Sequence, residues 1–311
     1  MTSLEEQILH LEKKGEKTRS LLKIWYKTLK EFKKRHGYFP NLLTPKSFSE
    51  KLTYRKLYQR SLLLPLSRFA CKYSVRDYIK TSVGEKHLIP LIDTIFDSKD
   101  FSLDKLPSSF IMKASHGSGW NYIVHDKKKE DETQLRRLIS AWLNCNYSIS
   151  FTGESQYENI RPCVVVEELL IDENGKVPKD YKFHCFGKAG SEKVIIQVST
   201  DRLQDHSLAF LSEDWDLLDL SFDKYKKTSI KPEKPEDLIQ LISIAKDLSK
   251  FFDYSRIDLY THQSNIYFGE ITFLPGNGME KFNPEEMDLE FGLLMKDFEL
   301  KKDPILKRFI R

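Results

Sequence analysis

The stretch Ser109–Val124 reads SFIMKASHGSGWNYIV, and its pattern decides how the rest of the chain is interpreted. An apolar run predicts a strand that delivers Lys113, and a loop of small residues then leads into a second predicted strand. Glycines let backbone N–H groups approach phosphate oxygens, and a neighbouring lysine adds a positive charge. The loop does not match a Walker A motif. The stretch therefore fits either a phosphate-binding hairpin or an ordinary hairpin turn.

A strand that ends in two acids follows at residues 164–170, VVVEELL. Glu167 and Glu168 come directly after its β-branched residues. Such acids can lie at a hinge and contact an adenine amino group and a ribose. The alternative is a strand that simply emerges into solvent.

A third pattern brings two carboxylates together, in RIDLY and in FGEIT. Because strand side chains alternate with period two, Arg256 and Asp258 share one face. Glu270 and Thr272 share a face of the next strand, so a hairpin would make Asp258 and Glu270 converge. Two carboxylates at one place repel unless a cation lies between them, and magnesium is the common solution. The alternative is a solvent-facing pair with salt bridges to lysines.

The first part of the chain reads as helical. Apolar residues at steps of three and four predict two helices, or one weakened in the middle, between Ser3 and His36. Thr44-Pro45 predicts the start of another helix, which runs to residue 60. Mostly helices first, then hairpin-like strands with interspersed helices, indicate an α+β fold rather than a strict βαβ array.

Composition excludes several classes of protein. Hydrophobic residues make up 40% of the 311, and glycine and proline are sparse, which argues against disorder. No run of 18 apolar residues and no signal peptide is evident, so a cytoplasmic location is expected. The cysteines are widely spaced without a CxxC pair, which predicts free or buried thiols: Cys71, Cys145, Cys163 and Cys185.

Positive charge is concentrated near the N-terminus. Residues 1–60 hold 15 Lys and Arg against 6 Asp and Glu, a net of +9, whereas the whole chain has a net charge of +4. This asymmetry indicates an anionic partner, such as a membrane surface, an acidic polymer or another protein. The alternative is a solvated helix face. No nucleic-acid partner is expected.

Taken together and in this order, these pieces resemble the ATP-grasp superfamily. Within it, the chain is similar to the TupA-like branch of teichuronopeptide and capsular polysaccharide biosynthesis. The resemblance covers nearly everything from about residue 40 onward, and Gln197 to Arg202 also belong to it. Its segments are PKSFSEKL (45–52), KYSVRDYI (72–79), HLIPLI (87–92), SFIMKASHGSGWN (109–121), VVVEELL (164–170), KDYKFHCF (179–186), SRIDLY (255–260) and YFGEITFLPGNGMEKFNPEEMDLEFG (267–292).

The resemblance implies an ATP-grasp fold, in which two α+β lobes clasp ATP, with a helical N-terminal extension. The implied segments are a basic helical extension at 1–40, a pre-grasp region at 41–107, a small lid lobe at 108–170 and a C-terminal lobe with the metal site at 171–311.

The resemblance also implies a role for each site residue. It implies that ATP is contacted by Lys72, Lys113, Gly117, Ser118, Gly119, Glu167, Glu168, Leu170 and Asp180. It implies two magnesium ions, with ligands Asp258, Glu270 and Thr272, the last standing where many members have asparagine. It implies that the catalytic groups, which would hold the transferred phosphoryl group, are Lys182, Arg202 and Arg256.

The implied activity is ATP-dependent ligation of a carboxylate to an amine through an acyl phosphate. The implied substrates are an amino acid and a uronic acid or amino sugar of a bacterial surface polysaccharide. The basic N-terminal helices would contact the inner face of the membrane or a synthase complex. Two alternatives stay open. One is a metal-dependent glycosyltransferase that uses Asp214 and Asp216 as a DxD motif; the other is a non-catalytic ATP-binding partner of a polysaccharide synthase.

Overall fold

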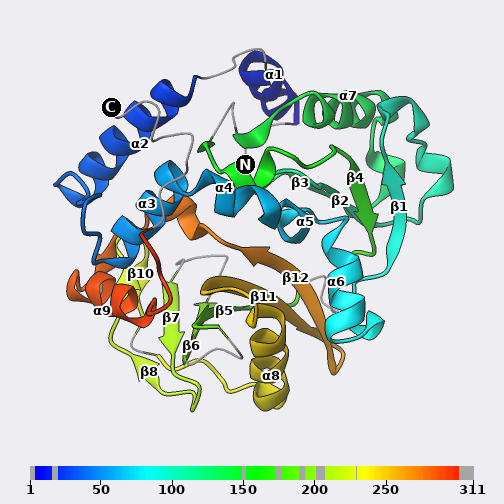
Figure 1. Cartoon of the computed structure of the whole chain (residues 1–311). Coiled ribbons are helices and arrows are strands. Elements are labelled where there is room, and N and C mark those ends of the chain that lie inside the picture. Colours follow the sequence, from blue (N-terminus) through cyan, green and yellow to red (C-terminus); the bar gives the residue numbers. More distant parts are fainter. Residues whose placement is uncertain are drawn as a thin grey trace. The chain divides into compact units, whose positions relative to one another are not determined.

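The computed structural model describes residues 4–15, 20–148, 152–171, 177–188, 193–200, 207–228 and 230–300. The chain forms two compact units, each assembled from segments that are far apart in the sequence (Figure 1). The first unit comprises Met1–Ile24, Ser61–Tyr78 and Leu88–Val177, and the second comprises Trp25–Arg60, Ile79–His87 and Pro178–Arg311. Both units combine helices with mainly antiparallel sheet, so the predicted α+β class is confirmed. The segment boundaries at residues 40, 107 and 170 remain predictions.

The first unit is built on a four-stranded antiparallel sheet in the order β1-β4-β2-β3. Its strands are β1 Leu91–Ile95, β2 Phe110–Ala114, β3 Asn121–Val124 and β4 Val164–Glu167. Its helices are α1 Leu4–Gly15, α5 Ser67–Ala70 and α7 Glu132–Leu143, with most of α4 Arg60–Leu63 and the first half of α6 Val75–Ser82. The predicted hairpin of SFIMKASHGSGWNYIV is thus confirmed as β2 and β3.

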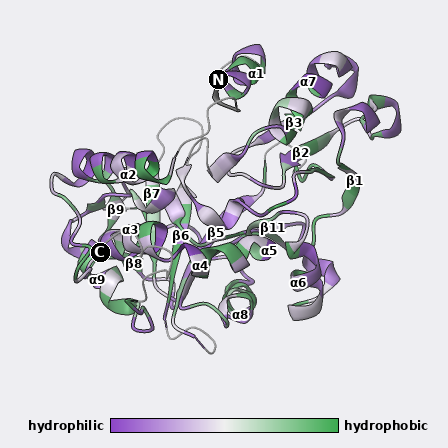
Figure 2. Ribbon diagram, turned by 45° about the horizontal axis from the view of Figure 1, so that its top comes forward, coloured by the Kyte–Doolittle hydropathy of each residue, from purple (hydrophilic) through white to green (hydrophobic). Residues whose placement is uncertain are grey.

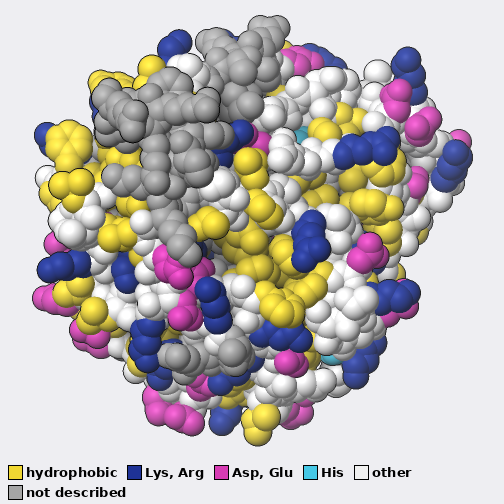
Figure 3. All heavy atoms as spheres, in the orientation of Figure 1, with side chains coloured by type: hydrophobic (Ala, Val, Ile, Leu, Met, Phe, Trp, Pro, Cys, Tyr) yellow, Lys and Arg dark blue, Asp and Glu magenta, His cyan; other side chains and the backbone are white. Residues whose placement is uncertain are grey.

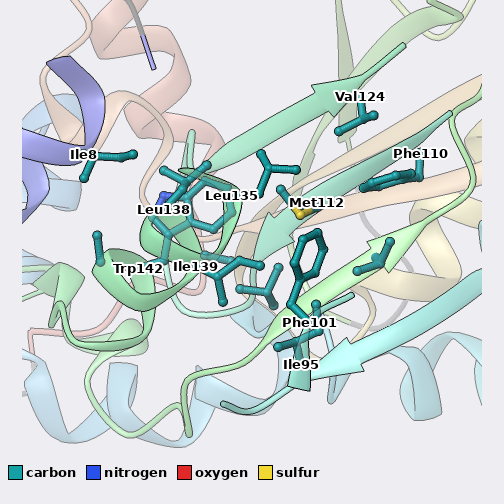
Figure 4. Packing of buried hydrophobic residues seen from close by; sticks show 14 of the residues in the cluster. Ile8, Ile95, Phe101, Phe110, Met112, Val124, Leu135, Leu138, Ile139 and Trp142 are labelled. Carbon is teal, nitrogen blue, oxygen red and sulfur yellow. The ribbon is translucent and has the colours of Figure 1, made fainter. Parts of the chain in front are cut away.

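Helix α7 packs on this sheet because its apolar residues recur at helical spacing. Ile8 and Leu11 of α1 enter the same core, and Arg137 of α7 pairs with Glu5 and Glu12 of α1 at 2.8 and 3.0 Å. The hydrophobic cluster includes Ile8, Ile95, Phe101, Phe110, Met112, Val124, Leu135, Leu138, Ile139 and Trp142 (Figure 4). Helix α1 is therefore part of the core of the first unit.

The second unit is built on a larger sheet in the order β10-β7-β6-β5-β11-β12, with β8 paired to β7. Its strands are β5 Lys179–Phe186, β6 Lys193–Thr200, β7 Ser207–Leu211, β8 Leu217–Leu218, β10 Lys226–Lys227, β11 Tyr254–His262 and β12 Asn265–Thr272, and the separate pair β9 Ser221–Phe222 and β13 Phe282–Asn283. Its helices are α3 Phe48–Tyr58, α8 Leu238–Ser249, α9 Glu286–Leu294 and most of α2 Leu21–His36. Helix α8 lies against β5 and β11 (Figure 1).

Aromatic rings fill the core of the second unit around Phe48, at the start of α3. Phe48 packs edge-on against Tyr254 and Phe291, with ring centroids 4.9 and 5.8 Å apart. Helix α3 begins later than the sequence predicted, since its capping box lies at Ser47 and Glu50 rather than at Thr44-Pro45. There the hydroxyl of Ser47 accepts a hydrogen bond from the backbone N–H of Glu50.

Of the two alternatives predicted for the N-terminal helical stretch, two helices are found, since α1 spans Leu4–Gly15 and α2 spans Leu21–His36. Ser3, where the stretch was predicted to begin, lies outside the described residues. Hydrophilic and hydrophobic residues alternate along α2 (Figure 2). Among the described residues, no helix has the length and hydropathy that a membrane span requires. The predicted free thiols are confirmed, and all of them are buried: Cys71, Cys145, Cys163 and Cys185.

Candidate active site

Polar side chains line one face of three neighbouring strands, β5, β11 and β12. The register pairs Asp258 with both Glu270 and Lys182. Two positions earlier on β11, Arg256 pairs with Thr272 and with His184. Since strand side chains alternate, these residues project from the same face of the sheet. The predicted hairpin therefore forms, and it places Asp258 opposite Glu270.

Arg256 lies at the centre of this group. Its Nε donates to Oδ1 of Asp258 at 2.7 Å, and its Nη2 donates to Oδ2 of the same carboxylate at 2.8 Å. The same Nη2 donates to Oε1 of Glu270 at 3.0 Å and to Oγ1 of Thr272 at 3.2 Å. One guanidinium thus bridges both carboxylates with charge-assisted hydrogen bonds.

Lys182 supplies a second cation beside Asp258. Its Nζ donates to Oδ2 of Asp258 at 2.7 Å and to Oδ2 of Asp180 at 2.6 Å. The side chain of Asp258 is 2% exposed, whereas that of Glu270 is 32% exposed. Glu270 is therefore the carboxylate of this pair that an incoming ligand can reach.

Charges in this network keep one another ionised. Burial alone would raise the pKa of Asp258, but Arg256 and Lys182 outweigh it, and the pKa is lowered. Burial would lower the pKa of Lys182, but the nearby carboxylates Asp258, Asp180 and Glu270 together outweigh it, and the pKa is raised. At neutral pH both groups therefore carry their charges.

A buried histidine lies next to the charged residues on β5. Nε2 of His184 is 3.0 Å from Oε1 of Gln197, which can only accept a hydrogen bond, so the ring proton belongs on Nε2. Nδ1 then accepts from the hydroxyl of Tyr254 at 2.9 Å. Burial and the charge of Arg256 lower the pKa of His184 to about 4, so the ring is neutral at physiological pH. Sequence reasoning assigned His184 no role, although it stands at period two from Asp180 and Lys182.

The carboxylate pair fits a hard divalent cation. Magnesium prefers oxygen ligands and is commonly held by one or two carboxylates together with nucleotide phosphates. Asp258 and Glu270 bring such oxygens to one place, although a cation would reach Asp258 only by displacing Arg256 or Lys182 from its oxygens. The hydroxyl of Thr272 donates to Glu270 at 3.2 Å. Within the described ranges, no group of three or more His, Cys, Asp and Glu side chains could hold a metal ion. Phosphate oxygens of a nucleotide would have to complete the coordination.

In the first unit, an acid holds two cations. Oε2 of Glu167 accepts from Nζ of Lys113 at 2.7 Å, and its Oε1 accepts from Nη1 of Arg76 at 2.9 Å. The other terminal nitrogen of Arg76 donates to the carbonyl of Ile89 at 2.9 Å. The three charged side chains are each 15% exposed or less. Sequence reasoning did not single out Arg76, although it lies within the quoted segment KYSVRDYI.

The glycine loop between β2 and β3 is held by a lysine and by aromatic rings. Nζ of Lys72 donates to the carbonyl of Gly117 at 2.6 Å. A Cβ at Gly117 would lie 2.9 Å from the Trp120 ring and 3.0 Å from that of Tyr147, so a larger residue would displace these rings. Gly119 has a φ of +73°, which favours glycine, and both it and Ser118 are exposed. The loop thus offers backbone groups to solvent at its tip.

The remaining predicted site residues are placed as follows. Glu168 is exposed and its backbone N–H donates to the carbonyl of Pro90 at 3.1 Å, and Leu170 is half-buried. Asp180 belongs to the second unit, where it pairs with Lys182. Arg202 lies outside the described residues.

The DxD motif of the glycosyltransferase alternative forms a tight turn between β7 and β8. Trp215 is buried in this turn with a φ of +71°, and its indole N–H donates to the carbonyl of Pro232 at 2.9 Å. Asp214 and Asp216 are exposed, and the carboxylate of Asp216 pairs with Lys231 at 3.5 Å. The burial and hydrogen bond of Trp215 therefore explain the conformation of this turn.

Comparison with known proteins assigns a family to this chain. The family model described as TupA-like ATPgrasp matches residues 50–296, which is more than half of the chain. A comparison with curated proteins found no significant match.

Several solved structures are similar to the chain at low sequence identity. D-alanine–D-alanine ligase from Bacillus anthracis has 15% identity and a TM-score of 0.41, over 80% of this chain and 67% of that enzyme. The corresponding ligase from Helicobacter pylori has 18% identity and a TM-score of 0.41, over 74% and 61%. N5-carboxyaminoimidazole ribonucleotide synthetase from Thermotoga maritima has 13% identity and a TM-score of 0.34, over 72% and 48%. These similarities are weak and the chain spans about half to two thirds of these enzymes, so the family match carries the assignment.

Proposed function

The chain belongs to the TupA-like ATP-grasp family, and we propose that it is an ATP- and magnesium-dependent ligase that joins a carboxylate to an amine. The observation that carries the proposal is the hydrogen-bonded group of Asp258, Glu270 and Arg256 on one face of the sheet. Paired carboxylates beside an arginine and a lysine are the groups that metal-assisted phosphoryl transfer requires.

The proposed reaction has two steps. An oxygen of the substrate carboxylate bonds to the γ-phosphorus of ATP as the bond to the β–γ bridging oxygen breaks, giving an acyl phosphate and ADP. The amine nitrogen then attacks the acyl carbon, inorganic phosphate leaves, and the nitrogen loses a proton to give the amide. No covalent bond to the protein is needed, so the protein mainly binds, orients and neutralises charge.

Each charged residue has a proposed part in this reaction. Magnesium, when bound at Asp258 and Glu270, would neutralise charge on the phosphates. Arg256 would exchange carboxylate oxygens for oxygens of the phosphoryl group in transfer, and Lys182 would keep Asp258 ionised and oriented. Arg202 is proposed as a second arginine for the same group.

In the first unit, Lys72 and Lys113 would contact the phosphates, and the loop of Gly117, Ser118 and Gly119 would cover them. Glu167 holds Lys113, and the backbone from Glu168 to Leu170 would contact the adenine. Asp180 would contact the ribose.

The substrate classes follow the resemblance rather than the geometry. We propose an amino acid as one substrate and a uronic acid or amino sugar of a bacterial surface polysaccharide as the other. Two magnesium ions are proposed on the same basis, and a cytoplasmic location stays a prediction from the sequence.

The test is ADP release from ATP and magnesium with a panel of amino acids, each with and without glucuronic or galacturonic acid glycans. Wild type is compared with Glu270→Gln and with Glu290→Gln, a control carboxylate exposed on α9. ADP release that needs one amino acid and one uronate, and that only Glu270→Gln abolishes, supports the ligase. ADP release that survives Glu270→Gln contradicts it, and tight ATP binding without turnover under any pairing supports the non-catalytic alternative.

A further inference from the structure

Helix α2 is anchored by one of its faces. Ile24, Thr28 and Phe32 recur every four residues and are buried. Trp25 packs edge-on against Tyr58 with ring centroids 4.7 Å apart. These contacts fix the rotation of α2 about its axis, so the opposite face is presented to solvent in a defined way.

The exposed face of α2 combines lysines with large apolar side chains. Leu22 is 82% exposed and Tyr26 is 69% exposed, one helical turn apart. The lysines that share this arc of the helix are Lys23, Lys27, Lys30, Lys33 and Lys34, and all are exposed. The one acid of the helix, Glu31, falls outside this arc and is half-buried. By contrast, Figure 3 shows lysines and arginines mixed with acidic side chains over much of the face drawn there.

Two lysines of this face lie over aromatic rings. Nζ of Lys30 is 6.0 Å from the ring centroid of Tyr26, and Nζ of Lys33 is 4.6 Å from that of Phe39. Phe39 is itself 59% exposed. The apolar side chains are thus interleaved with the charges instead of being separated from them.

We propose that this basic–apolar face, made of the five lysines with Leu22, Tyr26 and Phe39, docks on a bilayer that contains anionic phospholipids. Ammonium groups would contact lipid phosphates, while the apolar side chains enter the boundary between headgroups and acyl chains. Charge complementarity selects anionic over zwitterionic lipid. An acidic polysaccharide would match the lysines equally well but would leave Leu22 and Tyr26 in water, so a membrane fits the whole face better.

This docking is separate from the proposed ligase activity. Helix α2 ends at His36, before the family match begins at residue 50, and none of its residues belongs to the candidate active site. Turnover with soluble substrates and membrane binding can therefore fail independently.

The test is co-sedimentation of the full chain with vesicles of phosphatidylcholine alone and of phosphatidylcholine with 30% phosphatidylglycerol. The variant Lys23→Gln/Lys30→Gln/Lys33→Gln/Lys34→Gln removes four charges from the face. Its control, Lys99→Gln/Lys105→Gln/Lys128→Gln/Lys129→Gln, removes four exposed charges from the first unit. Circular dichroism and thermal unfolding are used to check that both variants fold.

The expected result is binding to the anionic vesicles only. At roughly fivefold per lysine, loss of four lysines should make the α2 variant bind about 600-fold more weakly, with little change in the control. The variant Leu22→Ser/Tyr26→Ser, which changes no charge, should also bind more weakly. Equal loss in the two lysine variants would show a general charge effect and overturn the proposal. Binding to soluble polygalacturonate but not to vesicles would overturn it in favour of an acidic polymer.

Discussion

Asp258 and Glu270 face each other across the β11–β12 hairpin, and a single nitrogen of Arg256 contacts an oxygen of each, at 2.8 and 3.0 Å. The two carboxylates share this partner but differ in exposure, because Asp258 is buried and also contacts Lys182. Their removal should therefore have different consequences for folding and for activity.

Glu270→Gln should separate activity from stability. Loss of a partly exposed charge should cost about 1 kcal/mol of unfolding free energy. Loss of a metal-binding oxygen should lower kcat/KM on the order of 100-fold. Urea unfolding and ADP release, measured on one preparation, check this. A loss of unfolding free energy large enough to unfold the variant in the assay would contradict the prediction, because unfolding would then explain the loss of activity.

Asp258→Asn should reduce stability as well as activity. The variant leaves Arg256 and Lys182 without their shared buried counter-charge, which typically costs about 3–5 kcal/mol. Urea unfolding of this variant beside Asp216→Asn, which removes an exposed aspartate, measures the difference. Equal midpoints for the two variants would show that the Arg256–Asp258–Lys182 group contributes little to folding.

Arg76→Gln should weaken ATP binding, even though Arg76 is expected to act through Glu167 and not by contacting ATP itself. Without Arg76, Glu167 keeps only Lys113 as a charged partner and should hold it more tightly, away from a phosphate. The Kd for ATP should rise by about tenfold, an interaction change of about 1.4 kcal/mol. Calorimetric titration with ATP, with Arg68→Gln as an exposed control, checks this. Two results would show that Arg76 positions Lys113 through Glu167 and that the variant is not merely misfolded. ATP affinity should be restored in Arg76→Lys, and Arg76→Gln should change KM with little change in kcat.

Acidification should destabilise the chain through His184. The ordinary pKa of this group is 6.5, and in the folded state it is lowered to about 4. Between pH 6.5 and 4 the unfolded chain therefore binds a proton at this histidine that the folded chain does not bind. The contribution of neutral His184 to the unfolding free energy is fully present above pH 6.5 and is lost as the pH falls toward 4. The loss is about 1.4 kcal/mol per pH unit. His36, whose pKa burial also lowers to about 4, contributes with the same sign.

Urea unfolding between pH 4.5 and 7.5 measures this dependence. His184→Gln should flatten the dependence in part, because His36 remains. His125→Gln, which changes an exposed histidine, should leave the slope intact. An unchanged slope in His184→Gln would show that this ring does not set the pH dependence.

Ile8→Ala should destabilise the first unit, because Ile8 is completely buried in its hydrophobic cluster. Truncating a buried isoleucine typically costs about 2–5 kcal/mol. Leu9→Ala, on the solvent side of the same helix, should cost less than about 0.5 kcal/mol. Thermal unfolding of the two variants compares them, and equal losses would mean that α1 is not part of the folded core in solution.

The local patterns in the sequence predicted much of the candidate site. Strand alternation at Arg256 and Asp258, with a short turn before Glu270, was sufficient to predict the hairpin and the facing carboxylates, because pairing in a tight hairpin leaves few registers. Glu167 could be placed at the end of a strand by the same reasoning.

Partners that lie far apart in the chain could not be predicted in this way. Lys182 and Asp258 are 76 residues apart, and Arg76 and Glu167 are 91 apart. Only the order of strands in the sheet and the packing of α6 bring these pairs together, and no local pattern specifies either. The start of α3 was misplaced for a smaller reason, since Ser47 competes with Thr44 as a helix cap and has Glu50 at the spacing of a capping box.

The double contact of Arg256 has a consequence for the order in which ligands load. Three acids, Asp180, Asp258 and Glu270, surround two cations, Lys182 and Arg256, so this group carries only one net negative charge. A free divalent ion would have to compete with Arg256 for its ligands while gaining little attraction. A nucleotide brings its own negative oxygens, which Arg256 can take in exchange for the carboxylates. Metal and nucleotide should therefore enter as one complex, with magnesium alone bound weakly.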